Sequence, residues 1–233
     1  ILIILFSVIV FSNSIEYLNN KKFKIYYPEN VQEAVINAIK SGRIWEKKLL
    51  NNYKDLILPG NTVLDIGAYL GTHTVAFSQL VGETGKVISF EPQTDIFTLL
   101  EKTITENNIT NVKLYNNAVY NSIKKIQFSN TNNGKASISH IRPRLPNPVK
   151  KEIQTITIDS LNLDRCDFMK IDVEMCEWVV LEGSEETITK YRPIIFVEIF
   201  KTPNNLLKLI TFTKQHNYSY ANMGGADFVL LPN

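Results

Sequence analysis

The chain has 233 residues, of which 44% are hydrophobic, and its 25 Lys and Arg residues against 23 Asp and Glu residues give a formal net charge of +2. This length fits one domain, or one domain with an appendage, and the apolar fraction is enough for a sizeable core. The near-neutral charge gives no electrostatic argument for nucleic acid as a partner. Three histidines and two cysteines exclude the common His/Cys zinc frameworks. We expect Cys166 and Cys176 to be free thiols near the core, in a reducing compartment.

An apolar run, ILIILFSVIVF, occupies positions 1–11 and is interrupted only by Ser7. It is shorter than the roughly 20 residues that span a bilayer. One interpretation is the remnant of a signal sequence or membrane anchor, which implies membrane association or the secretory pathway. The other is a buried strand or helix of a cytoplasmic protein. We therefore expect an N-terminal segment and linker over 1–30 and one domain over 31–233.

Strands and helices alternate along most of the remaining chain. After a strand over 22–28 and two helices over 31–42 and 44–57, a fully apolar, buried strand is predicted at 62–66. Further strands are predicted at 86–92, 112–120 (a strand and its loop), 152–158, 167–174 and 193–199. The intervening helices are predicted at 71–82, 94–108 (with Thr94 as N-cap), 177–191 and 203–217, and the last element is a hairpin over 218–232. The pattern predicts an α/β fold, a doubly wound, Rossmann-like and mostly parallel sheet of seven strands that ends in an antiparallel hairpin.

The segment 121–151 breaks this alternation. It contains one short strand candidate at 124–128 and then a long polar loop with three prolines. A loop of this length inside a compact domain is either functional or solvated and mobile.

Polar residues fall at or near the predicted carboxyl ends of five strands: Asp65, Glu91, Asn117, Asp172 and Glu198. In doubly wound sheets the ligand lies outside these strand ends. The sequence therefore predicts a binding site along this edge of the sheet.

The stretch DIGAYLG, from Asp65 to Gly71, predicts a glycine-rich turn that leads into a helix. An acid at this turn would repel a phosphate, so we expect a ligand that presents a cation or sugar hydroxyls. Asp65 suits the ammonium of a methionine moiety; alternatively, it caps the following helix. Glu91, 20 positions after Gly71, can accept both hydroxyls of a ribose, which serves NAD and S-adenosylmethionine equally.

Several blocks in order resemble the FkbM family of S-adenosylmethionine-dependent methyltransferases: GRIWE, PGNTVLDIGAYLGTHTVAFS, GKVISFEPQ, LYNNAV, DFMKIDVEMCEWVVLEG and RPIIFVEI. The resemblance covers residues 42–199 and implies the class I methyltransferase fold, in which one antiparallel strand is inserted near the sheet edge. Known members mostly methylate hydroxyls, often on sugars or on secondary metabolites.

The resemblance also implies a cofactor site. It places Asp65, Gly67 and Gly71 at the amino-acid end of S-adenosylmethionine, Glu91 at its ribose, Asn117 and Ala118 beside its adenine, and Trp45 and Glu46 over it. Tyr69 and Thr72 belong to the same turn. Two positions depart from the family pattern, because Tyr69 replaces the usual Asn and Met175 replaces the usual Gly. Tyr69 either removes a polar contact near methionine or replaces it with its phenol, and Met175 can narrow the acceptor pocket.

The acceptor hydroxyl needs a base, and the candidates are Asp172 and Glu174, which would share one face of an extended strand. Together they could also hold magnesium; alternatively, one of them caps the next helix. Glu198 could bind acceptor hydroxyls or be a paired structural acid. We expect Ser137 and His140 of the long loop to close over the acceptor, while His73 is structural or lies close to the cofactor.

The sequence thus predicts an S-adenosylmethionine-dependent O-methyltransferase acting on a hydroxyl of a glycan or small metabolite. Two other classes stay open. One is a non-catalytic, methyltransferase-like binding module, which Tyr69 and Met175 would explain. The other is a nicotinamide-dependent oxidoreductase, against which Asp65 argues.

Overall fold

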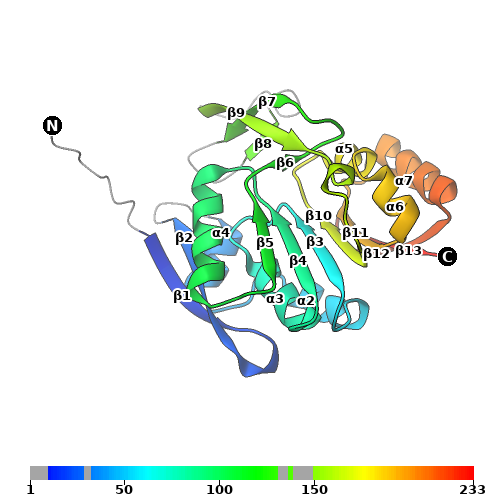
Figure 1. Ribbon diagram of the computed structural model, residues 1–233. Helices are drawn as coiled ribbons and strands as arrows, with labels where there is room; N and C mark the ends of the chain where they lie inside the picture. Colours follow the sequence, from blue (N-terminus) through cyan, green and yellow to red (C-terminus); the bar gives the residue numbers. More distant parts are fainter. Residues whose placement is uncertain (1–9, 29–32, 131–135, 139–148) are drawn as a thin grey trace.

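The computed structural model describes residues 10–28, 33–130, 136–138 and 149–233 (Figure 1). Most of the apolar run at positions 1–11 therefore lies outside the described residues. Across the described ranges, none of the helices is both long enough and apolar enough to cross a membrane.

A seven-stranded sheet forms the centre of the molecule (Figure 1). Its strands, in spatial order, are β12 (Tyr218–Gly224), β13 (Asp227–Pro232), β11 (Ile194–Glu198), β10 (Phe168–Ile171), β3 (Thr62–Ile66), β4 (Lys86–Phe90) and β5 (Val112–Tyr115). The neighbours from β11 to β5 are parallel, whereas β13 is antiparallel to both β11 and β12. This layout confirms the predicted class I methyltransferase fold.

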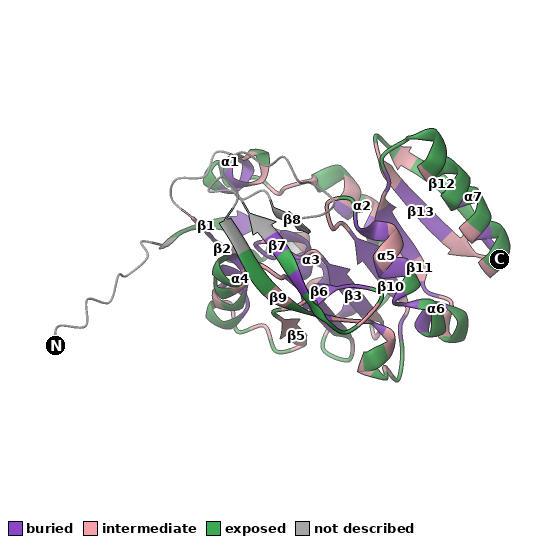
Figure 2. Ribbon diagram, turned by 90° about the horizontal axis from the view of Figure 1, so that it is seen from above, coloured by how far each residue is buried: buried purple, intermediate pink, exposed green. Residues whose placement is uncertain are grey.

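Helices cover both faces of this sheet, and Figure 2 shows the buried strands between helices whose outer surfaces are exposed. The helices whose buried residues join the first face are α2 (Lys47–Leu56), α3 (Thr72–Val81) and α4 (Thr94–Glu106). Those on the second face are α5 (Glu177–Glu182), α6 (Glu185–Tyr191) and α7 (Pro203–His216). Alternate strand residues face the two layers, since Val63 packs in the first cluster and Leu64 in the second.

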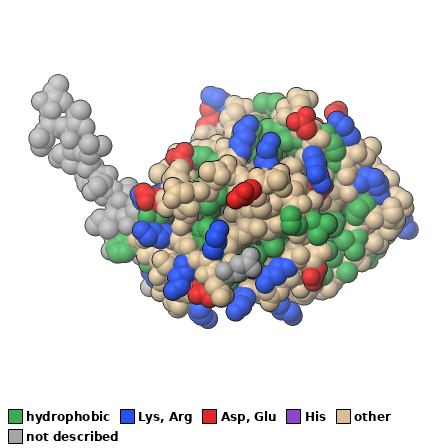
Figure 3. All heavy atoms as spheres, turned by 60° about the horizontal axis from the view of Figure 1, so that its bottom comes forward, with side chains coloured by type: hydrophobic (Ala, Val, Ile, Leu, Met, Phe, Trp, Pro, Cys, Tyr) green, Lys and Arg blue, Asp and Glu red, His purple; other side chains and the backbone are tan. Residues whose placement is uncertain are grey.

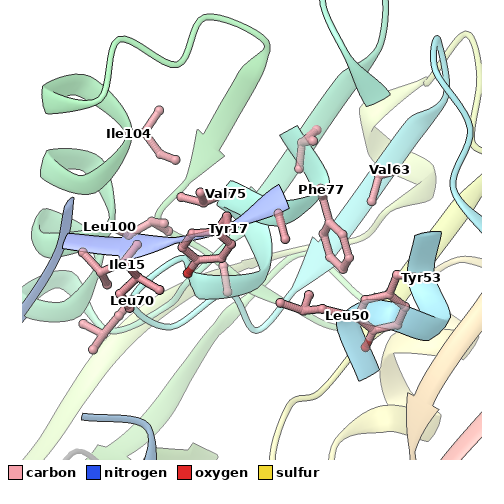
Figure 4. Packing of buried hydrophobic residues seen from close by; sticks show 14 of the residues in the cluster. Ile15, Tyr17, Leu50, Tyr53, Val63, Leu70, Val75, Phe77, Leu100 and Ile104 are labelled. Atoms are coloured by element: carbon pink, nitrogen blue, oxygen red, sulfur yellow. The ribbon is translucent and has the colours of Figure 1, made fainter. Parts of the chain in front are cut away.

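An N-terminal hairpin extends the first layer. It consists of β1 (Val10–Glu16) and β2 (Lys22–Pro28), joined by the short helix η1 (Leu18–Asn20), and it is followed by α1 (Ala34–Lys40). The hairpin docks on α4, where the amide N–H of Tyr26 donates to Thr103 Oγ1 at 3.2 Å. Its Ile15 and Tyr17 pack with Leu100 in the same core as the central sheet (Figure 4).

The segment over 121–151, predicted as a short strand at 124–128 and a long loop, contributes to a second sheet, which lies above the central one in Figure 1. Its strands, in spatial order, are β6 (Ala118–Val119), β9 (Val149–Ile156), β7 (Lys125–Asn130) and β8 (Ala136–Ile138). The prediction missed β8 and the first residues of β9 because the sequence there is mostly polar and contains three prolines. Cross-strand pairing, rather than burial of a hydrophobic run, defines these strands.

Three further local predictions are wrong. The N-cap of α4 is Gln93, and Thr94 is the first helical residue. The helix predicted over 177–191 is divided into α5 and α6 at Gly183, with the short helix η2 (Asp159–Leu161) packed against α6. Finally, β10 ends at Ile171, so Asp172 and Glu174 lie in a loop and not on an extended strand. The loop is not extended because Glu174 has a φ of 54°.

Candidate functional site

A cavity of about 540 Å³ opens at the carboxyl ends of the central strands. Residues that follow β3, β4, β5 and β10 line it, together with the start of α1 and Phe128 of β7. The position agrees with the rule that doubly wound sheets bind ligands beyond their strand ends. Nine of the residues that the sequence suggested for the cofactor or the acceptor lie on its wall: Trp45, Gly67, Tyr69, Thr72, Glu91, Asn117, Ala118, Asp172 and Glu174.

Glu91 is the best-defined acceptor on this wall. The residue is 3% exposed, and each carboxylate oxygen accepts one backbone N–H: Oε2 from Tyr69 at 3.0 Å and Oε1 from Gln93 at 2.8 Å. Burial raises its pKa to about 7, although these two hydrogen bonds oppose the shift. The remaining lone pairs can accept hydroxyl groups from a ligand in the cavity.

The glycine-rich turn fits closely against the loop after β10. Gly67 has a φ of 87°, and a Cβ there would lie 1.9 Å from the carbonyl oxygen of Asp172. Gly71, with a φ of 85°, is the N-cap of α3, and a Cβ there would lie 2.5 Å from Leu100 Cδ1. Gly71 does not line the cavity. At Gly67 a backbone oxygen excludes a Cβ, whereas at Gly71 the near atom is the end of a flexible leucine side chain, so the left-handed φ is what favours glycine there.

The two departures from the family pattern share one backbone feature. Tyr69 has a φ of 50° and Met175 a φ of 80°, which is the left-handed region that asparagine and glycine tolerate best. The Tyr69 hydroxyl donates to Glu33 Oε2 at 2.8 Å, across the mouth of the glycine turn. At both positions the backbone is therefore left-handed, and a residue that is strained in this conformation stands where the family has one that adopts it easily.

Asp65 does not line the cavity. Its side chain is 0% exposed, it accepts a hydrogen bond from Thr74 Oγ1 at 2.6 Å, and its Oδ1 lies 3.8 Å from Lys170 Nζ. Residues 65 and 170 are direct neighbours in the register of β3 and β10. The structure thus gives the acid a buried cationic partner, whereas the sequence suggested that it faces the ligand.

Lys170 is the functional candidate that the sequence analysis missed. It is 3% exposed, it lines the cavity, and its Nζ donates to Asp172 Oδ2 at 3.3 Å. Burial lowers the pKa of this lysine, but Asp172 and Asp65 together raise it above its ordinary value, so the side chain stays charged. A lysine inside the apolar strand FMKI was the available signal.

The loop after β10 brings several acids together. Asp172 and Glu174 line the cavity, and the Asp172 side chain is 43% exposed. Glu198, at the end of β11, is not on the cavity wall. Burial, together with repulsion from Asp172 and Glu174, raises the pKa of Glu198 to about 7.

On the α2 side, Trp45 lines the cavity and Glu46 does not. Glu46 Oε2 instead lies 3.4 Å from His73 Nε2, and burial raises the pKa of this glutamate to about 7. His73 lies on the cavity wall, and burial lowers its pKa well below the ordinary value. The imidazole is therefore neutral.

At the opposite end of the cavity, Asn117 and Ala118 line the wall together with Phe128 of β7. The sequence did not indicate Phe128, because its strand joins the site only through the second sheet. Ser137 belongs to β8, where its backbone pairs with residue 129. His140 lies outside the described residues. Both remain predictions.

Metal binding finds no support in the part of the chain that the structure describes, where no three His, Cys, Asp or Glu side chains could together hold an ion. The two cysteines, Cys166 and Cys176, are free and buried, as predicted. On the face seen in Figure 3, basic side chains are spread widely, with acidic and hydrophobic ones between them.

Comparisons with known proteins find methyltransferases, in agreement with the fold and the position of the cavity. A family model, the methyltransferase FkbM domain, matches residues 65–220. Among solved structures, methyltransferase FkbM from Methylobacillus flagellatus KT has 14% identity and a TM-score of 0.54, over 78% of this chain and 50% of that one. This chain therefore spans about half the length of that relative. No curated protein matches the sequence.

Two further structures show the same fold. A putative rRNA methylase from Clostridium thermocellum has 14% identity and a TM-score of 0.52, over 78% of this chain and 91% of that one. An S-adenosylmethionine-dependent O-methyltransferase from Thermotoga maritima has 13% identity and a TM-score of 0.50, over 92% and 75%. At such identities the likeness supports the fold alone.

Proposed function

The chain belongs to the FkbM methyltransferase family, and we propose that it transfers the methyl group of S-adenosylmethionine to a hydroxyl of a sugar, glycan or small metabolite. The observation that carries the proposal is Glu91, whose buried carboxylate is fixed by two backbone N–H groups and faces the cavity. A carboxylate held in this way is preorganised to accept both hydroxyls of the cofactor's ribose.

The strand order supports a direction for the cofactor. Asn117 and Ala118 follow β5, Glu91 follows β4, and the glycine turn follows β3. Adenine beside β5, ribose at β4 and the amino-acid end beyond β3 would occupy the cavity in sequence. Methyl transfer is an in-line displacement at carbon, so the protein's main task is to hold the donor and acceptor close and aligned.

Asp172 is the base that this proposal assigns to the acceptor hydroxyl. Its carboxylate lies at the partly exposed end of the cavity, and the buried ammonium of Lys170 holds one of its oxygens. The other oxygen could take the hydroxyl proton as the new carbon–oxygen bond forms, while the methyl carbon–sulfur bond breaks and S-adenosylhomocysteine leaves. Glu174, on the same wall, is the second candidate for contact with the acceptor.

Two measurements test the function. Calorimetry should show binding of S-adenosylhomocysteine and weak or no binding of NAD. Incubation with S-adenosylmethionine carrying a labelled methyl group and a panel of glycans and hydroxylated metabolites should then transfer label to a hydroxyl. Tight NAD binding without S-adenosylhomocysteine binding contradicts the proposal. Cofactor binding without transfer to any acceptor would favour a non-catalytic binding module.

A further inference from the structure

Three buried polar side chains, two of them charged, form a row across the central sheet at the β3–β10 end of the cavity. Ser89 of β4, Asp65 of β3 and Lys170 of β10 are neighbours in the strand register, and all three are buried. Ser89 Oγ donates to Thr74 Oγ1 at 3.2 Å, and Thr74 in turn donates to Asp65. A buried ion pair is rarely a net gain in stability over apolar residues, so this row calls for a functional reason.

Lys170, at the end of this row, is positively charged and lines the cavity. Lys170 is the one positively charged side chain among the described residues that line it, because His73 is neutral. Lysine has three N–H donors, and one is used by Asp172. Asp65 compensates the charge from behind, at 3.8 Å, without a hydrogen bond to its Oδ1. Donors of Lys170 therefore remain available to a bound group.

A second positive feature meets the cavity at the same end. The ten-residue helix α3 begins here, and no side chain caps its first N–H groups. Thr72 and His73, its first two residues, line the cavity. Unsatisfied N–H groups and the helix dipole favour an anion at this position.

We infer that Lys170, assisted by the N-terminus of α3, binds the carboxylate of the cofactor's amino-acid end. The inference rests on the proposed function. Four acids on the wall, Glu33, Glu91, Asp172 and Glu174, offer sites to the ammonium. Among the wall residues that the structure describes, a carboxylate finds its counter-charge only at Lys170. Glu91 directly follows β4 and Lys170 lies in β10, and these two strands are two strand spacings, or about 10 Å, apart. A ribose and the amino-acid chain on its 5′ carbon span a distance of this order.

The charge inferred to hold the amino-acid end of the cofactor is positive, whereas the sequence predicted a negative one. Asp65 was expected to receive the ammonium, but it lies behind Lys170 and is neutralised by it. Lys170 also lies deeper in the protein than Asp172, since the Lys170 side chain is 3% exposed and the Asp172 side chain is 43% exposed. The deep lysine serves the donor, and the more exposed aspartate remains available to the acceptor.

Binding measurements that need no acceptor test the inference. In the wild-type protein, decarboxylated S-adenosylmethionine should bind about tenfold to a hundredfold more weakly than S-adenosylmethionine, as expected for loss of a charged hydrogen bond. Lys170→Met should weaken S-adenosylhomocysteine by a similar factor. It should leave 5′-methylthioadenosine, which lacks the amino-acid end, within about twofold. Lys214→Met, an exposed lysine on α7, is the matched control and should change neither affinity.

Lys170→Met leaves the buried Asp65 without its positively charged partner. The double variant Asp65→Asn/Lys170→Met is therefore measured beside it, and circular dichroism checks that both variants fold. Equal affinity of the wild-type protein for S-adenosylmethionine and its decarboxylated form would overturn the inference without any variant. So would an equal loss of S-adenosylhomocysteine and 5′-methylthioadenosine in a folded variant, or no loss of either. A wild-type protein that binds none of these nucleosides contradicts the proposed function instead.

Discussion

Replacing Glu91 by glutamine tests the ribose site with almost no change in shape. Each carboxylate oxygen of Glu91 accepts one backbone N–H, from Tyr69 and from Gln93. Glutamine has one acceptor oxygen and one NH₂ group, so one of the two N–H donors would face another donor. The variant loses an acceptor for the ribose and leaves one buried N–H without a partner.

The size of the effect follows from charge and burial. Loss of a hydrogen bond to a charged group costs about 1.5–3 kcal/mol, which corresponds to a tenfold to hundredfold loss of S-adenosylhomocysteine affinity. Because the pKa of Glu91 is about 7, the wild-type carboxylate is mostly protonated at pH 6 and mostly ionised at pH 8. The ionised form accepts two hydroxyls, so the wild-type affinity should rise by up to about tenfold across this range.

Calorimetric titration of S-adenosylhomocysteine at pH 6, 7 and 8 measures both effects. Glu91→Gln should bind weakly at every pH and lose the rise, because its amide does not titrate. Glu101→Gln, an exposed glutamate on α4, controls for a general effect of removing one negative charge. Wild-type affinity in Glu91→Gln, or a rise with pH that survives in this variant, would refute the assignment of Glu91 to the ribose.

Three further outcomes are expected. Asp172→Asn should leave S-adenosylhomocysteine affinity within a few-fold and lower methyl transfer to an identified acceptor by about 10²–10⁴; normal turnover excludes Asp172 as the base. Met175→Gly should raise the free energy of unfolding in urea by about 0.5–1 kcal/mol relative to Met175→Ala, because the φ of 80° at this position strains any residue with a Cβ; equal stability of the two variants argues against strain. Burial raises the pKa of Glu177, which is 4% exposed, to about 7, so its contribution to stability is present at pH 4.5 and is lost as the pH rises through 7. Glu177→Gln should therefore match the wild-type stability in urea near pH 4.5 and exceed it at pH 8 by up to about 3 kcal/mol, and a constant difference between the two pH values contradicts this.

Local sequence patterns determined most of the fold. The strand over 62–66 was predicted with the bounds that the structure has, because a short apolar run between turn signals has few alternatives. The glycine spacing identified the turn at Gly67, and the strand ends identified Glu91 and Asp172 as residues of one site. These inferences succeed because parallel strands bring their carboxyl ends to a common edge, wherever the strands lie in the chain.

Tertiary structure alone decided which charges face the cavity. Asp65 and Lys170 are 105 positions apart in the sequence, and only the register of β3 and β10 makes them neighbours. Strand periodicity assigns a side chain to a face of the sheet, but not to a depth or to a partner on another strand. Phe128 likewise reaches the site only because β7 pairs with β9 in a second sheet. The sequence could therefore locate the site, whereas the packing of strands against one another determined its charge and its walls.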